Sequence, residues 1–293
     1  MHSAAALSTN APAVTAPSAN PPLVDSKAAI IQSIMDSRNA KSLDFYGKIV
    51  DQNNQAVSDV KVTARVGLYI SITHSGGKHY ETRSDSGGKF SFVGIHGAGA
   101  GFTLEKEGYI YDQIQASSSR PDDYAPDPNN PVIFHMWRQK GAEPMSHAEV
   151  HASVPCDGTS ASFNLLTGRP TGPLTVTLTR NPVNIDRSKP FNWTLTIGVT
   201  NGGIVANNDI YPNEAPTDGY QQSITIEMPT NVKDWTPTVS GSYYIKSGQA
   251  YGRMTIGGMA NFQPPPTAFD ADIYLNPSGS RNLEFDPAKQ INR

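Results

Sequence analysis

The sequence predicts an all-β protein with two antiparallel β-sandwich domains, preceded by one short N-terminal helix and a disordered N-terminal tail. Apolar and polar residues alternate with a period of two in many short segments of the chain. Clusters of Gly, Pro, Asn, Asp and Ser separate these segments, as turns separate strands. No helical pattern lies between the strand segments, which favours antiparallel sandwiches over a parallel sheet covered by helices.

The composition argues against several classes of partner. The chain has 293 residues, a formal net charge of -3 and 17% charged residues. It contains no Lys/Arg-rich run, so we expect no nucleic-acid partner. Its apolar runs are far shorter than the roughly 20 residues that span a bilayer, so we expect no transmembrane segment. The single cysteine, Cys156, rules out an intramolecular disulfide and a multi-cysteine zinc site, and we expect it to be a small packed residue.

Residues 1–24 are expected to be a disordered linker, because Pro and small residues bury too little surface to offset the entropy of ordering. The segment lacks the basic and continuous apolar regions of a signal peptide. Its Ala/Pro/Ser/Thr composition suits an export or wall-crossing linker. We therefore predict a secreted, periplasmic or cell-envelope location, with the tail of a cytoplasmic protein as the alternative.

The first domain is predicted to cover residues 25–140 and to begin with a helix in "DSKAAIIQSIMDSRN". Asp25 and Ser26 are candidate N-caps. The apolar stripe of this helix is expected to dock on the domain that follows, and it consists of Ala28, Ile31, Ile34 and Met35.

The next elements of this domain are strands. Alternation places Phe45, Gly47 and Ile49 on one face of the first strand. In the second strand, the inward set is expected to be Val60, Val62, Ala64 and Val66. In "SDSGGKFSF", Gly87 and Gly88 supply the positive backbone angles of a hairpin or bulge. A long proline-containing loop and a closing strand near Phe134 complete the domain.

Part of this domain resembles a known family. The segments "FYGKIVDQNNQAVSDVKVTARV", "TRSDSGGKFSFVGI" and "FTLEKEGYI" are similar to the carboxypeptidase regulatory-like domain, a transthyretin-like β-sandwich, over residues 42–112. The residues of this pattern have structural roles: Gly88 permits a turn, Phe90 and Phe92 fill the core, and Gly108 with Tyr109 closes the sheet. The resemblance implies a non-catalytic role, because this module is an appendage in the peptidases and a spacer or binding module in envelope proteins.

A hinge is predicted at Lys140 to Met145, and a second, jelly-roll-like sandwich over residues 145–293. Trp193 is in phase with Phe191 and Leu195 and is expected in the core. Further alternating sets start at Leu174, Ile224 and Phe269. The segments "VPCDGTSASFNLLTG", "NNDIYPNEAPTDGY" and "YLNPSGSRNLEFDPAKQI" resemble the C-terminal half of uncharacterised bacterial envelope proteins that carry the first module. That resemblance implies no activity.

Candidate ligand-binding residues are aromatic side chains outside the alternating core sets. Flat rings beside Asn, Asp and Gln groups can stack on a sugar and hydrogen-bond its hydroxyls. The alternative for these rings is structural anchoring of loops. The candidates are Trp235, Tyr211, Tyr220, Tyr243 and Tyr244.

Three groups of residues offer metal ligands. In "SHAEVHA", His147, Glu149 and His151 fail the zincin pattern, and in a strand the outer pair would lie about 13 Å apart, so only adjacent members could share an ion. Two acidic loops offer the oxygen ligands of calcium. The first loop contains Asp122, Asp123, Asp127 and Asn129. The second loop is the stronger candidate for a calcium site. Its predicted ligands are Asp209, Asn213, Glu214 and Asp218, and it also contains Asn208. Solvated side chains are the alternative throughout, and no other cofactor is expected.

These patterns favour a non-catalytic binding or architectural module with a polysaccharide or protein partner at the cell surface. The sequence contains no nucleophile elbow and no paired aspartic-protease motif. One alternative is a structural protein that assembles with itself or with an enzyme. A second is a hydrolase with an unfamiliar site in the second domain.

Overall fold

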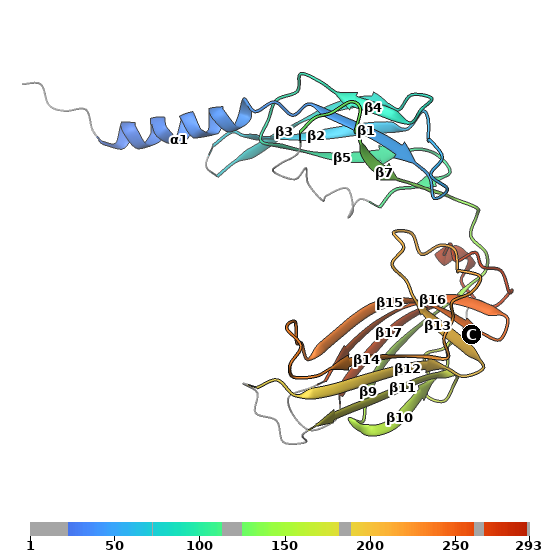
Figure 1. Cartoon of the computed structure of the whole chain (residues 1–293). Helices are drawn as coiled ribbons and strands as arrows, with labels where there is room; N and C mark the ends of the chain where they lie inside the picture. Colours follow the sequence, from blue (N-terminus) through green and yellow to red (C-terminus); the bar gives the residue numbers. More distant parts are fainter. Residues whose placement is uncertain (1–22, 72, 113–124, 182–188, 261–266, 292–293) are drawn as a thin grey trace, which may run out of the picture. The chain divides into compact units, whose positions relative to one another are not determined.

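The structure is a computed structural model that describes residues 23–71, 73–112, 125–181, 189–260 and 267–291. The chain forms two compact units, Met1–Trp137 and Arg138–Arg293, referred to below as the first and second domains. Strands dominate both domains, so the prediction of an all-β sandwich protein with one short helix is confirmed (Figure 1). The predicted disordered tail falls on residues 1–22, which lie outside the described residues, and on the first two residues of the helix.

Helix α1 spans Leu23–Asn39, so the proposed N-caps lie inside it. Its predicted apolar stripe is only partly covered: Met35 is buried, but Ile34 is 50% exposed. Docking is concentrated in the last turn, where the Asn39 side chain accepts a hydrogen bond from the Tyr69 N–H and donates one to the Tyr69 carbonyl. In the described part of the chain, no helix combines the length and the hydropathy needed to span a membrane.

The first domain packs two three-stranded sheets, with strand orders β4-β1-β7 and β3-β2-β5. The predicted inward set from Val60 to Val66 is fully buried. Phenylalanine rings from both sheets meet these residues, and the Phe45 and Phe102 centroids lie 4.2 Å apart. The strands are β1 (Phe45–Val50), β2 (Lys61–Tyr69), β3 (Ser75–Arg83), β4 (Lys89–Phe92), β5 (Gly99–Glu105), β6 (Tyr109–Ile110), β7 (Val132–His135) and β8 (Trp137–Arg138).

One pairing in this domain corrects the prediction of purely antiparallel sheets. Strand β7 pairs in parallel with β1, with Gly47 opposite Val132 and Val50 opposite His135. A tight hairpin forces neighbouring strands to run antiparallel, whereas a long connection leaves both directions open. Because residues 51–131, which include β2 to β6, separate β1 from β7, the chain can return in the direction of β1.

In the turn before β4, the predicted positive φ is present at Gly88 but not at Gly87. Gly88 has a φ of 75°, whereas Gly87 is not among the residues with positive φ. The Asp85 carboxylate closes the turn by accepting hydrogen bonds from the N–H groups of Gly87 and Lys89. Phe90 and Phe92 are buried, as predicted.

Substituting Gly88 with Ala should lower the free energy of unfolding by about 2 kcal/mol or more. An added Cβ would meet the Ile49 carbonyl oxygen, which is backbone and cannot rotate away. Gly94→Ala is the matched control, because Gly94 has a φ of 74° but no atom within 4 Å of the added Cβ. Urea unfolding should therefore show a clearly smaller loss for Gly94→Ala; equal losses would contradict the role given to the backbone contact.

The second domain packs a four-stranded sheet, β10-β11-β12-β14, against a five-stranded sheet, β13-β15-β16-β17-β9. The pairings between its described strands are all antiparallel. Trp193, Leu195 and Ile273 are buried between the sheets as predicted, and Cys156 is buried as well. The elements are β9 (Ser146–Val154), β10 (Asp157–Phe163), β11 (Leu174–Asn181), β12 (Asn192–Val199), β13 (Gly202–Ala206), β14 (Ser223–Met228), β15 (Thr238–Ser247), β16 (Ala250–Met259), β17 (Thr267–Asn276) and a 3-10 turn (Pro287–Lys289).

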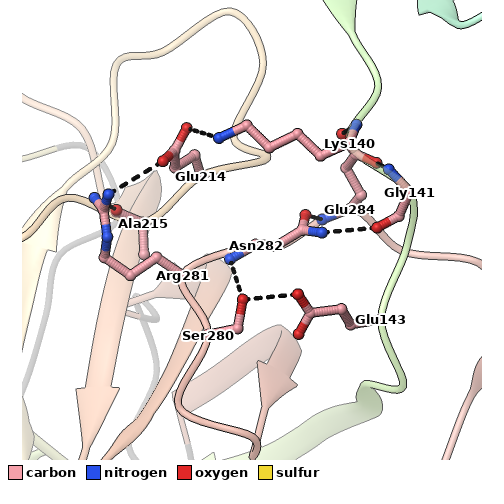
Figure 2. Close-up of polar contacts among 9 residues, drawn as sticks. All are labelled: Lys140, Gly141, Glu143, Glu214, Ala215, Ser280, Arg281, Asn282 and Glu284. Atoms are coloured by element: carbon pink, nitrogen blue, oxygen red, sulfur yellow. Dashed lines mark hydrogen bonds and ion pairs between the residues drawn. The ribbon is translucent and has the colours of Figure 1, made fainter.

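Residues 140–145, predicted as a hinge, are hydrogen-bonded to other parts of the second domain. The Glu284 carboxylate is buried and accepts hydrogen bonds from the N–H groups of Lys140 (2.7 Å) and Gly141 (2.8 Å) (Figure 2). The Asn282 side chain donates to the Gly141 carbonyl. Residues 140–145 therefore belong to the second domain, and the backbone polar groups of Lys140 and Gly141 have partners that the local sequence does not reveal.

The same segment is also held by side chains. Glu143 accepts hydrogen bonds from Ser280 (2.8 Å) and Asn276 (3.0 Å), and the bond from Asn276 contributes most to lowering the pKa of the Glu143 carboxyl. The Lys140 ammonium forms an ion pair with Glu214 at 2.6 Å. These contacts fasten residues 140–145 to the C-terminal segment and to the loop that carries Glu214; Figure 2 draws those made by Ser280 and Glu214.

Candidate functional site

Trp235, a predicted ligand-binding residue, is partly buried against the core of the second domain. Its indole N–H donates a hydrogen bond to the Phe191 carbonyl at 2.9 Å, and its ring meets the Phe191 ring edge-on at 5.2 Å. An indole held in this way anchors the connection between β14 and β15. The structure therefore favours the alternative reading of Trp235, structural anchoring.

The four tyrosine candidates do not form one surface. Tyr243 and Tyr244 are both buried, and they lie on opposite faces of β15 because successive strand residues alternate. Tyr243 belongs to the core between the sheets, whereas the Tyr244 hydroxyl donates to Asp209 at 2.6 Å on the outer face. Tyr220 is partly buried and donates to the Pro216 carbonyl at 3.2 Å. Tyr211 is partly exposed in the same loop.

Burial raises the pKa of Tyr220 from 10.0 to about 12. In the unfolded chain this hydroxyl ionises near pH 10, while in the folded chain it keeps its proton until about pH 12. The unfolded state therefore binds fewer protons between these values, and the stability from the neutral tyrosine, fully present below pH 10, is lost as the pH rises to about 12.

Tyr220→Phe should remove this part of the alkaline stability loss, because phenylalanine has no hydroxyl to ionise. The check is thermal unfolding of both proteins between pH 9 and about pH 12. Parallel stability curves for the two proteins would contradict the raised pKa of Tyr220.

The predicted calcium loop does not gather its oxygen ligands. Asn213 accepts a hydrogen bond from Arg253 at 3.1 Å, and Glu214 forms ion pairs with Lys140 and with Arg281. Asp209 accepts from Tyr244, and Asp218 is exposed beside Thr217. Backbone hydrogen bonds from Ala215 to Arg281 and from Leu283 to Asn213 hold the loop in place. The structure thus does not support the predicted set Asp209, Asn213, Glu214 and Asp218 as a calcium site.

In the first acidic loop, Asp122 and Asp123 lie outside the described residues. Asp127 accepts a hydrogen bond from the Asn129 N–H at 2.8 Å, the pattern of a local polar turn.

A polar cluster lies on the outer face of the five-stranded sheet. The segment "SHAEVHA" is part of strand β9, so His147, Glu149 and His151 share one face while Ala148 and Val150 point into the core. Strand β17 pairs with β9 and presents three further side chains on the same face. In register with the β9 residues, these are Tyr274, Asp272 and Asp270.

The two strands exchange imidazole and carboxylate contacts. His147 Nε2 lies 2.6 Å from Asp272 Oδ1, and His151 Nδ1 lies 2.8 Å from Asp270 Oδ1. The hydrogen bond with Asp270 raises the pKa of His151. Across the described parts of the chain, one group of at least three His, Cys, Asp or Glu side chains has ligand atoms close enough to share an ion. It consists of His147, Glu149 and Asp272, whose ligand atoms lie within 4.8 Å of one another.

Aromatic rings fix the orientation of His147. Its ring stacks on Tyr274 with centroids 4.4 Å apart and an interplanar angle of 7°, and it meets Phe285 edge-on at 5.9 Å. The Arg253 guanidinium lies 4.8 Å from the centroid of the Tyr274 ring. The imidazole is therefore held by ring packing as well as by Asp272.

A pocket of about 220 Å³ lies on the same face of the sheet. Asp272 and Tyr274 belong both to this pocket and to the polar cluster. Burial lowers the pKa of Arg253. The pocket is lined by Asn207, Pro212, Ser242, Arg253, Met254, Thr255, Asp272 and Tyr274. Sequence reasoning missed it, although alternation in "AYGRMTIGG" and "FDADIY" puts its polar members on one face of each strand.

The chain matches no family model, and searches of curated proteins and of solved structures return no match either.

Proposed function

We propose that this protein is a non-catalytic binding module, secreted or associated with the cell envelope, that binds saccharide with the outer face of the five-stranded sheet. The observation that carries the proposal is the pocket on this face, referred to below as the outer-face pocket. The proposal keeps the carbohydrate ligand predicted from the sequence but moves its site away from Trp235.

The chemistry of the outer-face pocket suits a ligand rich in hydroxyl groups. The Ser242 and Thr255 hydroxyls can each donate or accept, the Asp272 carboxylate accepts, and the Arg253 guanidinium donates. Tyr274 adds an aromatic ring beside these groups. A volume of about 220 Å³ is below the about 300 to 1,000 Å³ of pockets for drug-sized ligands, so the site suits one sugar unit of a longer chain.

The first domain supports a spacer role in this proposal. Its resemblance to the carboxypeptidase regulatory-like domain suggests an architectural module beside the binding domain. Strand β3 is a nine-residue edge strand that pairs with β2 alone among the described strands. It carries Lys78, Glu81 and Arg83, and charges on an edge oppose strand addition. Self-assembly through this edge is therefore the less favoured function.

The experiment is a glycan-array screen of the full chain, followed by calorimetry with the best-bound oligosaccharide. The double variant Ser242→Ala/Thr255→Val should weaken binding by about tenfold or more, since each lost hydrogen bond contributes about 1 kcal/mol. Both hydroxyls are exposed, so the fold should be retained.

Thr196→Val/Thr225→Val is the matched control. These two threonines form a similar hydroxyl pair, 3.1 Å apart, on the four-stranded sheet. The control should bind as the unmodified protein does. Equal losses in the two double variants, or no bound glycan on the array, would reject the proposal.

A further inference from the structure

We propose that His147, Glu149 and Asp272 form a binding site for one divalent transition-metal ion of the zinc type. This site shares Asp272 with the outer-face pocket, but it binds an ion and stands whether or not the pocket binds sugar.

The geometry of the three side chains suits a small ion. Zinc binds imidazole nitrogen and carboxylate oxygen at about 2.0 to 2.2 Å, which puts ligand atoms about 3.4 Å apart around a tetrahedral ion. The ligand atoms of His147, Glu149 and Asp272 lie within 4.8 Å of one another, and the His147 to Asp272 distance is 2.6 Å. Small rotations of the Glu149 and Asp272 carboxylates would bring the distances between ligand atoms close to about 3.4 Å. The ion would replace the hydrogen bond between His147 and Asp272.

The charge pattern supplies an independent argument for a cation. Glu149 and Asp272 are direct cross-strand partners, and like charges in that relation destabilise a sheet. Asp270, the next outward residue of β17, adds a third carboxylate on the same face. A divalent cation held between Glu149 and Asp272 would turn this repulsion into attraction.

The structure also selects which histidine takes part. His151 is directed to Asp270 through Nδ1 and approaches Glu149 with Nε2 at 3.6 Å, so its two nitrogens are used in different directions. His147 presents Nε2 to Asp272 and is fixed by stacking on Tyr274. Fixed ligands bind a metal with a smaller loss of side-chain entropy than mobile ones. Asp272 of β17 therefore supplies the third ligand beside His147 and Glu149, whereas His151 lies too far along β9 from His147 to share the ion.

An imidazole nitrogen with two carboxylates sets the expected selectivity. Nitrogen ligands favour zinc, cobalt, nickel and copper, whereas calcium and magnesium prefer sites made of oxygen alone. Three protein ligands leave a coordination position for water or another small ligand. Asp272 also lines the outer-face pocket, so that open position would lie next to the pocket.

The test is calorimetry of the metal-free full chain with Zn²⁺, with Ca²⁺ and Mg²⁺ titrated separately. We expect saturable binding of one Zn²⁺ to this site and no comparable binding of Ca²⁺ or Mg²⁺. Glu149→Gln should weaken the Zn²⁺ affinity at least about tenfold, because loss of even an outer-shell partner of a metal ligand costs about 10- to 100-fold. Asp272→Asn should give a similar loss while leaving a side chain that can hydrogen-bond His147.

Glu227→Gln is the matched control, because Glu227 is an exposed strand residue on the other sheet. Its Zn²⁺ affinity should equal that of the unmodified protein. Thermal unfolding in chelator shows whether each variant is folded, and Zn²⁺ should raise the unfolding temperature of the unmodified protein more than that of Glu149→Gln. Equal Zn²⁺ affinity for Glu149→Gln and the unmodified protein, or no saturable binding, would overturn the proposal. Neither result bears on saccharide binding, which is measured without metal.

Discussion

Replacing Trp193 with Ala should lower the free energy of unfolding by about 3 to 5 kcal/mol, the range for a large aromatic side chain removed from a core. Trp193 is 2% exposed between the two sheets, and its indole N–H donates to the Thr236 carbonyl at 2.9 Å. The substitution leaves a cavity and a carbonyl without its donor. Chemical denaturation of the full chain, followed by tryptophan fluorescence and far-UV circular dichroism, measures the loss.

Trp235→Ala provides the comparison for this prediction. Trp235 also donates its indole N–H to a carbonyl, but its side chain is only partly buried, so the expected loss is smaller. Trp193→Phe keeps most of the buried ring, so its loss in the free energy of unfolding should lie between that of Trp235→Ala and that of Trp193→Ala. A loss for Trp235→Ala as large as that for Trp193→Ala would contradict the assignment of Trp193 to the core and Trp235 to its margin.

Replacing Glu284 with Ala should cost about 3 kcal/mol, because two backbone N–H groups lose a carboxylate acceptor and hydrogen bonds to charged groups contribute about 1.5 to 3 kcal/mol each. The effect should be local as well as global. Hydrogen exchange at the amides of Lys140 and Gly141 should lose its protection, since both donate to Glu284.

Glu214→Ala is the control for Glu284→Ala. Glu214 also contacts residues 140–145, but through an ion pair between partly exposed side chains, which contributes about 0 to 1 kcal/mol. The amides of Lys140 and Gly141 should stay protected in this variant. If Glu284→Ala left their exchange unchanged, the role given to the buried carboxylate would be wrong.

Alternation in the sequence predicts the strands and their buried faces because the pleat of a strand has a period of two. It identified Val60 to Val66 and Trp193 as core residues, and it placed His147 and Glu149 on one face. It also excludes a shared surface for Tyr243 and Tyr244, although their identical chemistry suggested one. Local pattern is therefore a sound guide to which face a side chain occupies.

Which distant strands and loops contact each face depends on tertiary contacts, and the local sequence pattern does not encode them. Asp272 meets His147 from a strand more than 120 positions away, and Glu284 reaches Lys140 across 144 positions. The parallel pairing of β7 is of the same kind, since it depends on how a long connection returns. The cluster of His147, Glu149 and Asp272 and the fastening of residues 140–145 emerge only when these distant strands and loops are assembled.

In the proposed function, the outer face of the five-stranded sheet, and not the loop around Trp235, is the binding surface of the second domain. Hydrogen exchange followed by mass spectrometry tests it directly, on the full chain with and without the oligosaccharide that the array identifies. We expect protection in peptides from β15, β16 and β17, which carry Ser242, Thr255 and Asp272. Protection confined to residues 229–237 or to the first domain would contradict it.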